Sequence, residues 1–165
     1  VSIDPPAGVK LIEIQTAQEM LKASEKSLPA DIFVASAAVA DWSPEFQKSK
    51  IKKGKAAPSI KLKENPDILK TIATSKKRPK LVVGFAAETE NLIKNAKEKL
   101  ARKGCDWILA NDASNIASEE NHVHLITRSG AEDWKKQSKR AIARKLAEKI
   151  AVQLGKTSSK AKAAV

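Results

Sequence analysis

Hydrophobic positions along the chain switch between two spacings, and these switches predict alternating strands and helices. Apolar residues alternate with polar ones or form short runs in four segments that are expected to be strands: 9–14, 31–38, 80–85 and 106–110. Spacings of three and four predict helices over 16–28, 67–75, 88–103 and 138–155. The order predicts an α/β fold: a doubly wound, mostly parallel, Rossmann-like sheet with helices on both faces and a C-terminal β-hairpin plus helix.

Residues with known capping and turn preferences set the expected ends of these elements. Thr16 and Glu19 have the spacing of a capping box, and Pro66 suits the first turn of a helix. Gly104 and Gly155 are expected to end helices. The turn residues at 129–130 predict a hairpin that joins 122–127 to 132–136, and a short extended piece is expected at 59–62.

The chain length and cysteine usage predict one domain in a reducing compartment. Residues 1–155 are expected to form the domain, and the Lys/Ala/Ser-rich residues 156–165 a disordered tail. No apolar run approaches the ~20 residues that span a bilayer, so no membrane role is expected. A lone cysteine, Cys105, predicts a packing role and a cytoplasmic location. The chain begins without methionine, like the middle of a longer protein.

The positive charge is concentrated in two short regions. The net charge is +12, but residues 48–63 carry seven lysines and no acid, and residues 156–165 add three more. Removing these ten lysines leaves +2 for the remainder. Such a distribution favours a local anion site over a broad nucleic-acid-binding face. The chain also has only three Phe, three Trp and no Tyr, too few for repeated base stacking.

Three predicted strands end in small residues followed by polar ones, at 35–41, 84–88 and 110–112. Ligands of doubly wound sheets bind at the carboxyl ends of strands, and small residues there allow close approach. No glycine-rich phosphate loop, Walker lysine motif or zinc-ligand spacing is present. The sequence therefore predicts an anion site that relies on lysines, or one whose glycine loop lies upstream.

Five motifs occur in an order and spacing that resemble one family. They are Ser-Ala-Ala-Val-Ala-Asp-Trp (36–42), Lys-Ile-Lys-Lys (50–53), Asn-Pro-Asp-Ile-Leu (65–69), Gly-Phe-Ala-Ala-Glu-Thr (84–89) and Ala-Asn-Asp (110–112). Together they resemble the phosphopantothenoylcysteine synthetase domain of the bifunctional bacterial coenzyme A biosynthesis protein. The resemblance covers residues 5–155. It implies a cytoplasmic ligase that activates 4'-phosphopantothenate with CTP to an acyl-cytidylate and then joins it to cysteine.

The resemblance also implies roles for individual residues. Lys50 would be the catalytic flap lysine that contacts the phosphates, and Asp41 would lie near the ribose or triphosphate. Phe85 would pack against the cytosine or sugar, and Lys99 and Lys103 would bind the triphosphate. The remaining nucleotide-binding residues would be Ala35, Ser36, Ala37, Ala38, Pro66, Asp67, Ile68 and Leu69.

Residue spacing and residue type provide evidence on some of these roles without the resemblance. Lys99 and Lys103 share one helix face, and a like-charge pair at this spacing costs about 0.2–0.5 kcal/mol unless an anion lies between them. Without the resemblance, an ordinary solvated helix face is the favoured interpretation of the pair, and a core position that of Phe85. The family context favours the triphosphate role for the lysines, and the position of Phe85 at the carboxyl end of a strand weakens the core interpretation. His122 and His124 are interpreted as structural or surface residues rather than a base or a metal pair, and no protein-bound metal is predicted.

The family resemblance implies further cofactors and partners. Mg²⁺ would accompany CTP, and FMN would belong only to the decarboxylase domain of the bifunctional parent. The glycine-rich segment and the asparagine of the family's upstream half are missing, so the piece is expected to be inactive as a ligase alone. A homodimer without nucleic-acid or membrane partners is expected. The alternatives are a noncatalytic nucleotide-binding module and a small nucleic-acid-binding domain.

Overall fold

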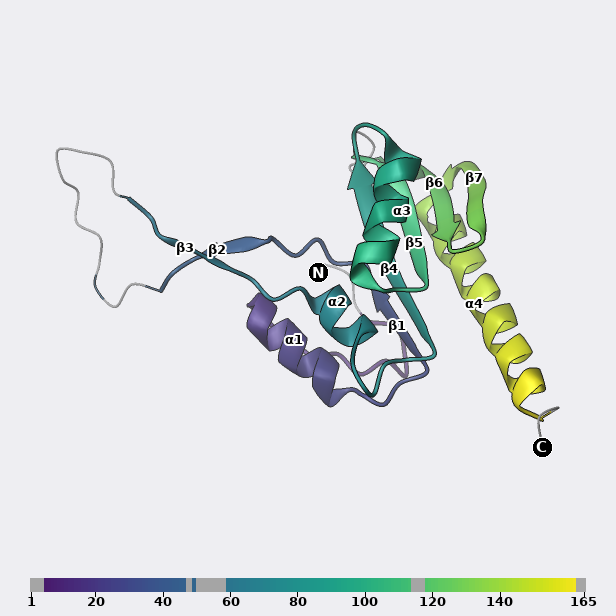
Figure 1. Cartoon of the computed structure of the whole chain (residues 1–165), viewed down its shortest axis with the longest axis horizontal. Coiled ribbons are helices and arrows are strands. Elements are labelled where there is room, and N and C mark those ends of the chain that lie inside the picture. The colour runs from purple at the N-terminus through teal and green to yellow at the C-terminus, as the bar shows by residue number, and fades with distance from the viewer. Residues whose placement is uncertain (1–4, 47–48, 50–58, 114–117, 163–165) are drawn as a thin grey trace. The chain divides into compact units, whose positions relative to one another are not determined.

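The computed structural model describes residues 5–46, 49, 59–113 and 118–162, with side chains as far as Gly155. The chain divides into two compact units, Val1–Val82 and Val83–Val165, and the boundary lies inside β4 (Leu81–Glu88). The strands form a five-stranded sheet of order β1-β4-β5-β6-β7 and a two-stranded sheet of β2 and β3 (Figure 1). This mixed sheet, its helices and its C-terminal hairpin followed by α4 confirm the predicted α/β class.

The first unit begins its regular structure at α1 (Ala17–Lys26). The Thr16 hydroxyl accepts a hydrogen bond from the Glu19 amide at 3.2 Å, and the Glu19 carboxylate accepts one from the Thr16 amide at 3.0 Å. These two bonds satisfy amide groups that the first helical turn leaves without partners. The predicted capping box is therefore confirmed.

The predicted strand at 9–14 is wrong. No strand forms over these residues, and the side chains of Val9, Leu11 and Ile12 are all exposed. Alternation alone does not make a strand, because a strand needs a neighbour to satisfy its backbone groups. Within the described residues no strand pairs with this segment.

The core of the first unit forms around α2 (Ile68–Ala73), which contacts α1, and the start of β4. Ile68, Ile72 and Leu81 are buried there. β1 (Ile32–Ala35) is shorter than the predicted 31–38. The Leu81 amide donates to the Asp31 carbonyl at the start of this strand, at 3.2 Å.

The short antiparallel pair of β2 (Trp42–Pro44) and β3 (Leu62–Glu64) also belongs to the first unit. Its register places Trp42 opposite Glu64 and Pro44 opposite Leu62. The sequence indicated a basic loop at the first of these strands and an extended piece at 59–62 near the second. The pairing of β2 with β3 joins residues that are far apart in the sequence, so the pattern of neither segment predicts it.

The second unit contains the rest of β4 and, in chain order, α3 (Leu92–Lys103), β5 (Trp107–Asp112), β6 (Glu120–Thr127), β7 (Gly130–Ser138) and α4 (Lys139–Lys162). β4 and β5 are parallel, whereas β6 is antiparallel to β5 and β7 to β6. The predicted hairpin is therefore confirmed, with strands longer than expected. The core of the second unit is apolar and includes the fully buried Cys105, Ile108 and Trp134. The packing role predicted for Cys105 agrees with its burial.

α3 and α4 cover opposite faces of this part of the sheet. Asn95 of α3 donates its side-chain amide to Glu88 at the end of β4, at 3.2 Å. Glu132 of β7 instead pairs with Lys149 of α4, at 2.6 Å. The strand registers place Glu88 and Glu132 on opposite faces, because alternate residues of a strand point to opposite sides. This arrangement confirms the predicted helices on both faces of the sheet.

Two helix boundaries differ from the sequence prediction. α3 begins at Leu92 rather than near Glu88, because Glu88 still pairs with Asp112 in the parallel ladder. It ends at Gly104, as predicted, where the glycine adopts φ 70°. α4 continues to Lys162, past the predicted stop at Gly155 and into the predicted disordered tail. A glycine inside a helix costs only about 1 kcal/mol, so Gly155 alone does not end the helix.

No helix within the described part of the chain has both the length and the apolar character needed to cross a membrane.

Candidate functional site

The first part of the candidate site is the segment that follows β1. Ala35 ends this strand, and Ser36, Ala37, Ala38 and Asp41 follow it as exposed residues. The side chains of Ser36, Ala37 and Ala38 are small, and the close approach of a ligand to this segment stays a prediction. The Asp41 carboxylate is available to solvent.

Asn65 ties this segment to the start of α2. Its amide Nδ2 donates to the Ala40 carbonyl at 2.9 Å, and its backbone amide donates to the Asp41 carbonyl at 2.7 Å. Its Oδ1 accepts from the Ser43 hydroxyl at 2.9 Å and from Gln18 Nε2 at 3.5 Å. One side chain therefore contacts α1, β2 and the segment after β1.

The residues that follow Asn65 form the second predicted nucleotide-contacting segment. Asp67 is the N-cap of α2, and its carboxylate accepts from the Lys70 amide at 3.0 Å. Pro66 precedes the cap instead of occupying the first turn, because the Asp67 cap starts the helix at Ile68. Ile68 is only 6% exposed and packs in the core, whereas Leu69 is half-buried.

An apolar groove of about 810 Å³ runs beside Asn65 within the first unit. Its lining comes from the start of α1, from the β2–β3 pair and from the residues next to them. Trp42, Phe46 and Ile60 supply apolar surface, while Lys61 and Lys63 supply two positive charges against the one negative charge of Glu45. Such a lining suits a ligand that carries both an apolar or aromatic part and a negative charge.

The second unit carries the other predicted nucleotide ligands. Phe85 is half-buried in β4, and its neighbours Gly84 and Ala86 point to the opposite face, toward α3. Phe85 therefore lies on the face of the sheet away from the helix that carries Lys99 and Lys103. A ligand that contacts all three must pass the carboxyl ends of the strands, because β4 is an interior strand of the sheet.

Lys99 has a perturbed environment. Burial lowers the pKa of the Lys99 ammonium below its ordinary value, and the nearby Lys103 lowers it further, while the Glu88 carboxylate acts in the opposite sense. An ammonium with this environment is stabilised when an anion binds beside it. The observation agrees with the triphosphate role that the resemblance implies for Lys99, although it is also expected of any crowded lysine pair.

The direction of α3 separates its two lysines from the tip of β4. The helix runs back from the carboxyl end of β4 toward the start of β5, as Figure 1 shows. Its 12 residues extend about 18 Å, so Lys103 in the last turn lies far from the carboxyl end of β4. Lys99 is nearer, because it lies about one helical turn before Lys103 in α3.

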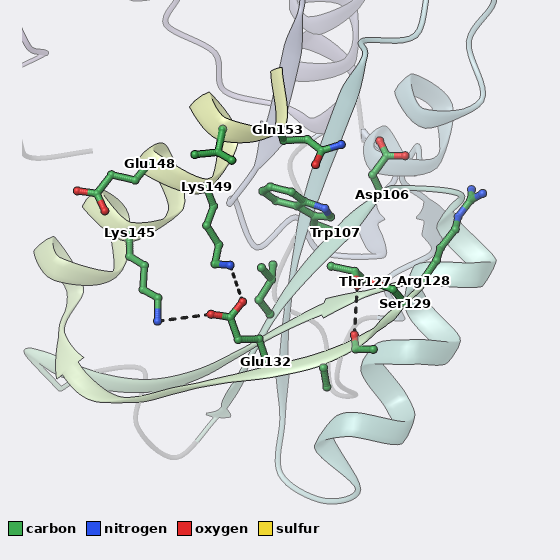
Figure 2. Close-up of a pocket in the computed structure, with 14 residues that line it drawn as sticks. Asp106, Trp107, Thr127, Arg128, Ser129, Glu132, Lys145, Glu148, Lys149 and Gln153 are labelled. Atoms are coloured by element: carbon green, nitrogen blue, oxygen red, sulfur yellow. Dashed lines mark hydrogen bonds and ion pairs between the residues drawn. The ribbon is translucent and has the colours of Figure 1, made fainter. Parts of the chain in front are cut away.

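A further concavity of the second unit lies elsewhere. Its volume is about 940 Å³, and it is bounded by α4, by the β6–β7 turn and by Trp107 (Figure 2). Glu132 pairs there with Lys149 at 2.6 Å and with Lys145 at 3.7 Å. The hydrogen bond from Lys149 is the main cause that lowers the pKa of Glu132. Both lysines are paired with the Glu132 carboxylate, and none of the predicted site residues lines the cavity, so we do not assign the nucleotide to it.

The structure describes some of the predicted site residues but not all of them. Lys50, the predicted catalytic flap lysine, lies outside the described residues. The segments around Asp41 and Asp67 are brought together within the first unit by Asn65. Asn65 belongs to the motif at 65–69, but the sequence did not predict its role. The contacts of Ser43 and Gln18 with Asn65 were not predicted either. No local signal identifies this role, because the bonds of Asn65 reach Ala40 and Ser43, 25 and 22 positions earlier in the chain.

The fold places this chain in the α/β class of proteins. Its mixed, doubly wound sheet includes strands that end in small residues followed by polar ones. The sequence profile described as the DNA/pantothenate metabolism flavoprotein C-terminal domain matches residues 1–154. The chain belongs to this family, which agrees with the resemblance found in its motifs.

Individual relatives match most of this chain but less than half of their own length. The coenzyme A biosynthesis bifunctional protein CoaBC of Borreliella burgdorferi is 39% identical over 145 residues, covering 86% of this chain and 37% of that protein. The CoaBC of Haemophilus influenzae is 39% identical over 162 residues, covering 95% of this chain and 40% of that protein. The chain thus spans roughly two fifths of the length of these relatives.

Solved structures agree with the fold. The crystal structure of the C-terminal domain of the coenzyme A biosynthesis bifunctional protein CoaBC superposes with a TM-score of 0.75 at 30% identity, covering 94% of this chain and 71% of that one. The DNA/pantothenate metabolism flavoprotein of Streptococcus pneumoniae superposes with a TM-score of 0.77 at 18% identity, covering 93% of this chain and 77% of that one. The second likeness supports the fold alone.

Proposed function

We propose that this chain is part of a CTP-dependent phosphopantothenate–cysteine ligase of coenzyme A biosynthesis. The observation that carries the proposal is its 39% identity to two proteins named as bifunctional in coenzyme A biosynthesis, over 86% and 95% of the chain. The motifs that resemble the synthetase domain fall within residues 1–154, which the family profile matches. The flavin chemistry expected of the decarboxylase domain is not assigned to this chain.

The Asn65 contacts support a ligand site in the first unit. They hold Ala40 and Asp41 against the segment that begins α2, and the resemblance implies nucleotide contacts for both segments. A pre-formed arrangement of this kind lowers the ordering cost of binding. In the proposed site the ligand contacts the exposed backbone at 35–38, Asp41, and residues 66–69.

The proposed reaction has two steps. A carboxylate oxygen of 4'-phosphopantothenate attacks the α-phosphorus of CTP, the bond between the α- and β-phosphates breaks, and pyrophosphate leaves. The amine of cysteine then attacks the acyl carbon, its carbon–oxygen bond to CMP breaks, and the amine loses a proton. Both steps place negative charge on phosphate oxygens, which positioned cations stabilise.

Lysines of this chain are proposed to supply those cations. Lys99 and Lys103 would bind the triphosphate from α3, and Lys50 would contact the phosphates as the catalytic residue. Lysine is a compact point charge on a flexible stem, so it suits phosphates that move during the reaction. The separation of Lys103 from the tip of β4 implies that the triphosphate extends along α3 rather than lying across the strand ends.

Magnesium is proposed to enter with the nucleotide. Mg²⁺ prefers oxygen ligands and is commonly held by one or two carboxylates plus substrate phosphates. Within the described residues, the single cluster of three metal-ligating side chains contains two histidines and lies away from Asp41 in sequence. The chain thus suits Mg²⁺ carried mainly by the phosphates, where it would neutralise charge on the CTP.

The test uses the protein that also carries the residues encoded upstream of Val1, compared with the present chain. With CTP, Mg²⁺, 4'-phosphopantothenate and cysteine, the longer protein should release pyrophosphate and form 4'-phosphopantothenoylcysteine, identified by mass spectrometry. The present chain should bind CTP in calorimetry without turnover. Absence of pyrophosphate from the longer protein would exclude the ligase.

The alternatives give different results in the same assays. A noncatalytic nucleotide-binding module binds CTP in both proteins but releases no pyrophosphate in either. A nucleic-acid-binding domain binds oligonucleotides with a steep salt dependence, retained after deletion of 156–165. Replacing CTP by ATP tests nucleotide selectivity, which is proposed here from the resemblance.

Assembly and location are proposed on the same basis. We expect a cytoplasmic homodimer without nucleic-acid or membrane partners, with the β6–β7 hairpin as a plausible contributor to the contact. Light scattering of the purified protein should give twice the mass of one chain. A monomer at micromolar concentration would contradict this expectation.

A further inference from the structure

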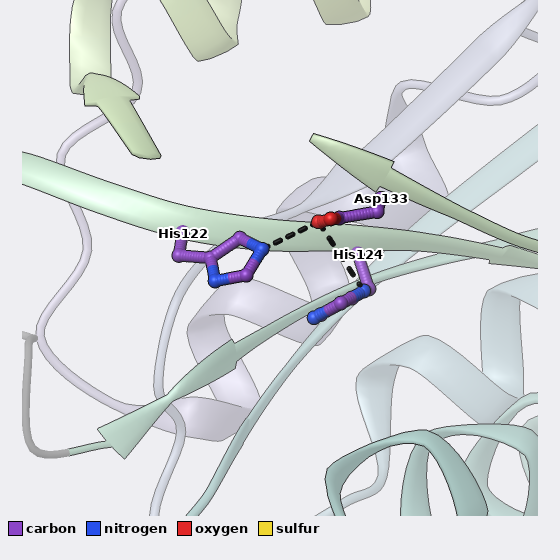
Figure 3. Close-up of side chains that lie close together, drawn as sticks. All are labelled: His122, His124 and Asp133. Carbon is purple, nitrogen blue, oxygen red and sulfur yellow. Dashed lines mark hydrogen bonds and ion pairs between the residues drawn. The ribbon is translucent and has the colours of Figure 1, made fainter. Parts of the chain in front are cut away.

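Two histidines and one aspartate meet on one face of the β6–β7 hairpin (Figure 3). His124 lies directly opposite Asp133 in the antiparallel register, and its Nδ1 is 3.7 Å from the Asp133 carboxylate. His122 lies two residues before His124, and its Nε2 also contacts Asp133. The sequence places the histidines on one face, but only the strand pairing brings Asp133 to them.

The distances suit a bound ion. The ligand atoms of the three side chains all lie within 4.8 Å of one another. Tetrahedral zinc bonds of 2.0–2.2 Å place neighbouring ligand atoms roughly 3.3–3.5 Å apart. Small side-chain rotations would therefore bring the three groups onto one ion, and the His122–Asp133 contact would open to admit it.

The surroundings support the same reading. The two imidazole rings lie with their centroids 4.7 Å apart and are inclined at 40°, so neither ring blocks the other. His124 pairs on its other side with Ala110 of β5, a small neighbour. His122 and Asp133 side chains are 46% and 54% exposed, which leaves a path for an ion and for a water ligand.

We infer that His122, His124 and Asp133 form a three-ligand site for a divalent transition metal, with zinc as the first candidate. Two imidazole nitrogens and one carboxylate are a ligand set that zinc accepts, with water in the remaining position. Nitrogen ligands disfavour Mg²⁺, so this site differs in chemistry from the Mg²⁺ proposed to accompany CTP. This revises the interpretation of the two histidines as surface residues without a metal.

The site would link β6 to β7 next to an irregularity in their pairing. The register shifts between Asn121 and Val123, so His122 sits where the regular ladder is interrupted. A metal held by both strands would close this gap and stabilise the hairpin, because an ion that binds only the folded state favours folding. The inference is independent of the proposed ligase activity.

The chain is well suited to a direct test, because His122 and His124 are its only histidines. The full chain, without a polyhistidine tag, is titrated with Zn²⁺ and followed by the imidazole proton resonances. Both histidine signals should shift or broaden and reach a limit at one ion per chain. If neither signal responds, or only one does, the inference is overturned, and this readout needs no variant.

Variants provide a second readout by calorimetry with Zn²⁺. His124→Ala and Asp133→Asn should each weaken binding by roughly tenfold or more. Glu120→Gln is the matched control, because Glu120 is a carboxylate of the same hairpin that pairs with Lys136 outside the cluster, and it should bind like the unmodified chain. Unchanged affinity in the chain with both histidines replaced, or one ion shared by two chains, would refute the site.

Discussion

Asn65 donates its side-chain amide to the carbonyl of Ala40, 25 positions earlier in the chain, at 2.9 Å. The same residue also bonds through its backbone amide to the Asp41 carbonyl. These contacts fix two segments of the proposed nucleotide site in one arrangement. Asn65 is thus a positioning residue for the first unit, and its role can be separated from that of groups expected to contact the ligand.

Replacement of Asn65 should weaken both folding and binding. Asn65→Ala removes the bonds to Ala40 and Ser43, and the unfolding free energy should fall by about 1–3 kcal/mol, since each such bond contributes roughly 0.5–1.5 kcal/mol. CTP affinity should fall as well. Gln18→Ala is the control, because its bond to Asn65 is long, at 3.5 Å, and its loss should matter little. Equal behaviour of the two variants in denaturant titration and calorimetry would refute the role of Asn65.

Asp67 combines a helix cap with a proposed ligand contact, and two substitutions separate these roles. Asp67→Ala removes the cap of α2 and should lower stability by about 1 kcal/mol, whereas Asp67→Ser retains a capping oxygen and should cost little. If Asp67 also contacts the nucleotide, CTP affinity should fall in both variants. Thermal unfolding and calorimetry provide the two measurements. A serine variant with unchanged CTP affinity would assign Asp67 to capping alone.

Lys99 should oppose stability in the free protein and favour binding. Burial and the nearby Lys103 lower the pKa of Lys99, so its charged form is disfavoured in the fold. Lys99→Met should therefore unfold at a temperature equal to or above that of the unmodified chain, while CTP affinity falls by roughly tenfold or more, as for a lost charge-assisted bond. Lys97→Met is the control, because Lys97 is exposed on the same helix.

The pH dependence provides a separate check on Lys99. Because its folded-state pKa is lowered, the unfolded chain binds more protons between that value and the ordinary pKa of a lysine, and stability rises with pH in this window. The stability advantage of Lys99→Met should therefore shrink as the pH rises toward about 10.4. Denaturant titrations from neutral to alkaline pH measure the difference. An advantage that is constant with pH would show that the effect is not electrostatic.

Lys50→Ala tests the residue that the resemblance assigns to catalysis. Pyrophosphate release by the longer protein should fall sharply, while the thermal unfolding of the ligand-free chain should change little, because a flap lysine that reaches toward phosphate buries little surface. Lys52→Ala, in the same lysine cluster, is the comparison. A marked loss of thermal stability in Lys50→Ala would make Lys50 structural and contradict the flap role.

Local signals in the sequence predicted local structure well. Thr16 and Glu19 identified the start of α1, because both partners of the capping box lie within one helical turn. Gly104 identified the end of α3 for a similar reason. The strand predicted at 9–14 failed because a strand depends on a partner elsewhere in the chain, and its own alternation carries no information about that partner.

The candidate site shows the same division between local and distant information. The motif at 65–69 was visible in the sequence, but the bonds of Asn65 to Ala40 and Ser43 depend on how distant segments meet. The metal cluster is similar: His122 and His124 could be placed on one face from their spacing, while Asp133 enters only through the hairpin register. The placement of Phe85 and Lys99 on different faces likewise follows from the strand pairing.

The tryptophans give each unit its own optical reporter. Trp42 is 58% exposed at the start of β2, next to Asp41, whereas Trp134 is fully buried under α4, with the Lys145 ammonium 4.7 Å from its ring. Emission from Trp42 should be red-shifted and accessible to quenchers, and emission from Trp134 should be blue-shifted and protected. With Trp107 replaced by phenylalanine, one fluorescence spectrum would separate events in the first unit from the melting of the second.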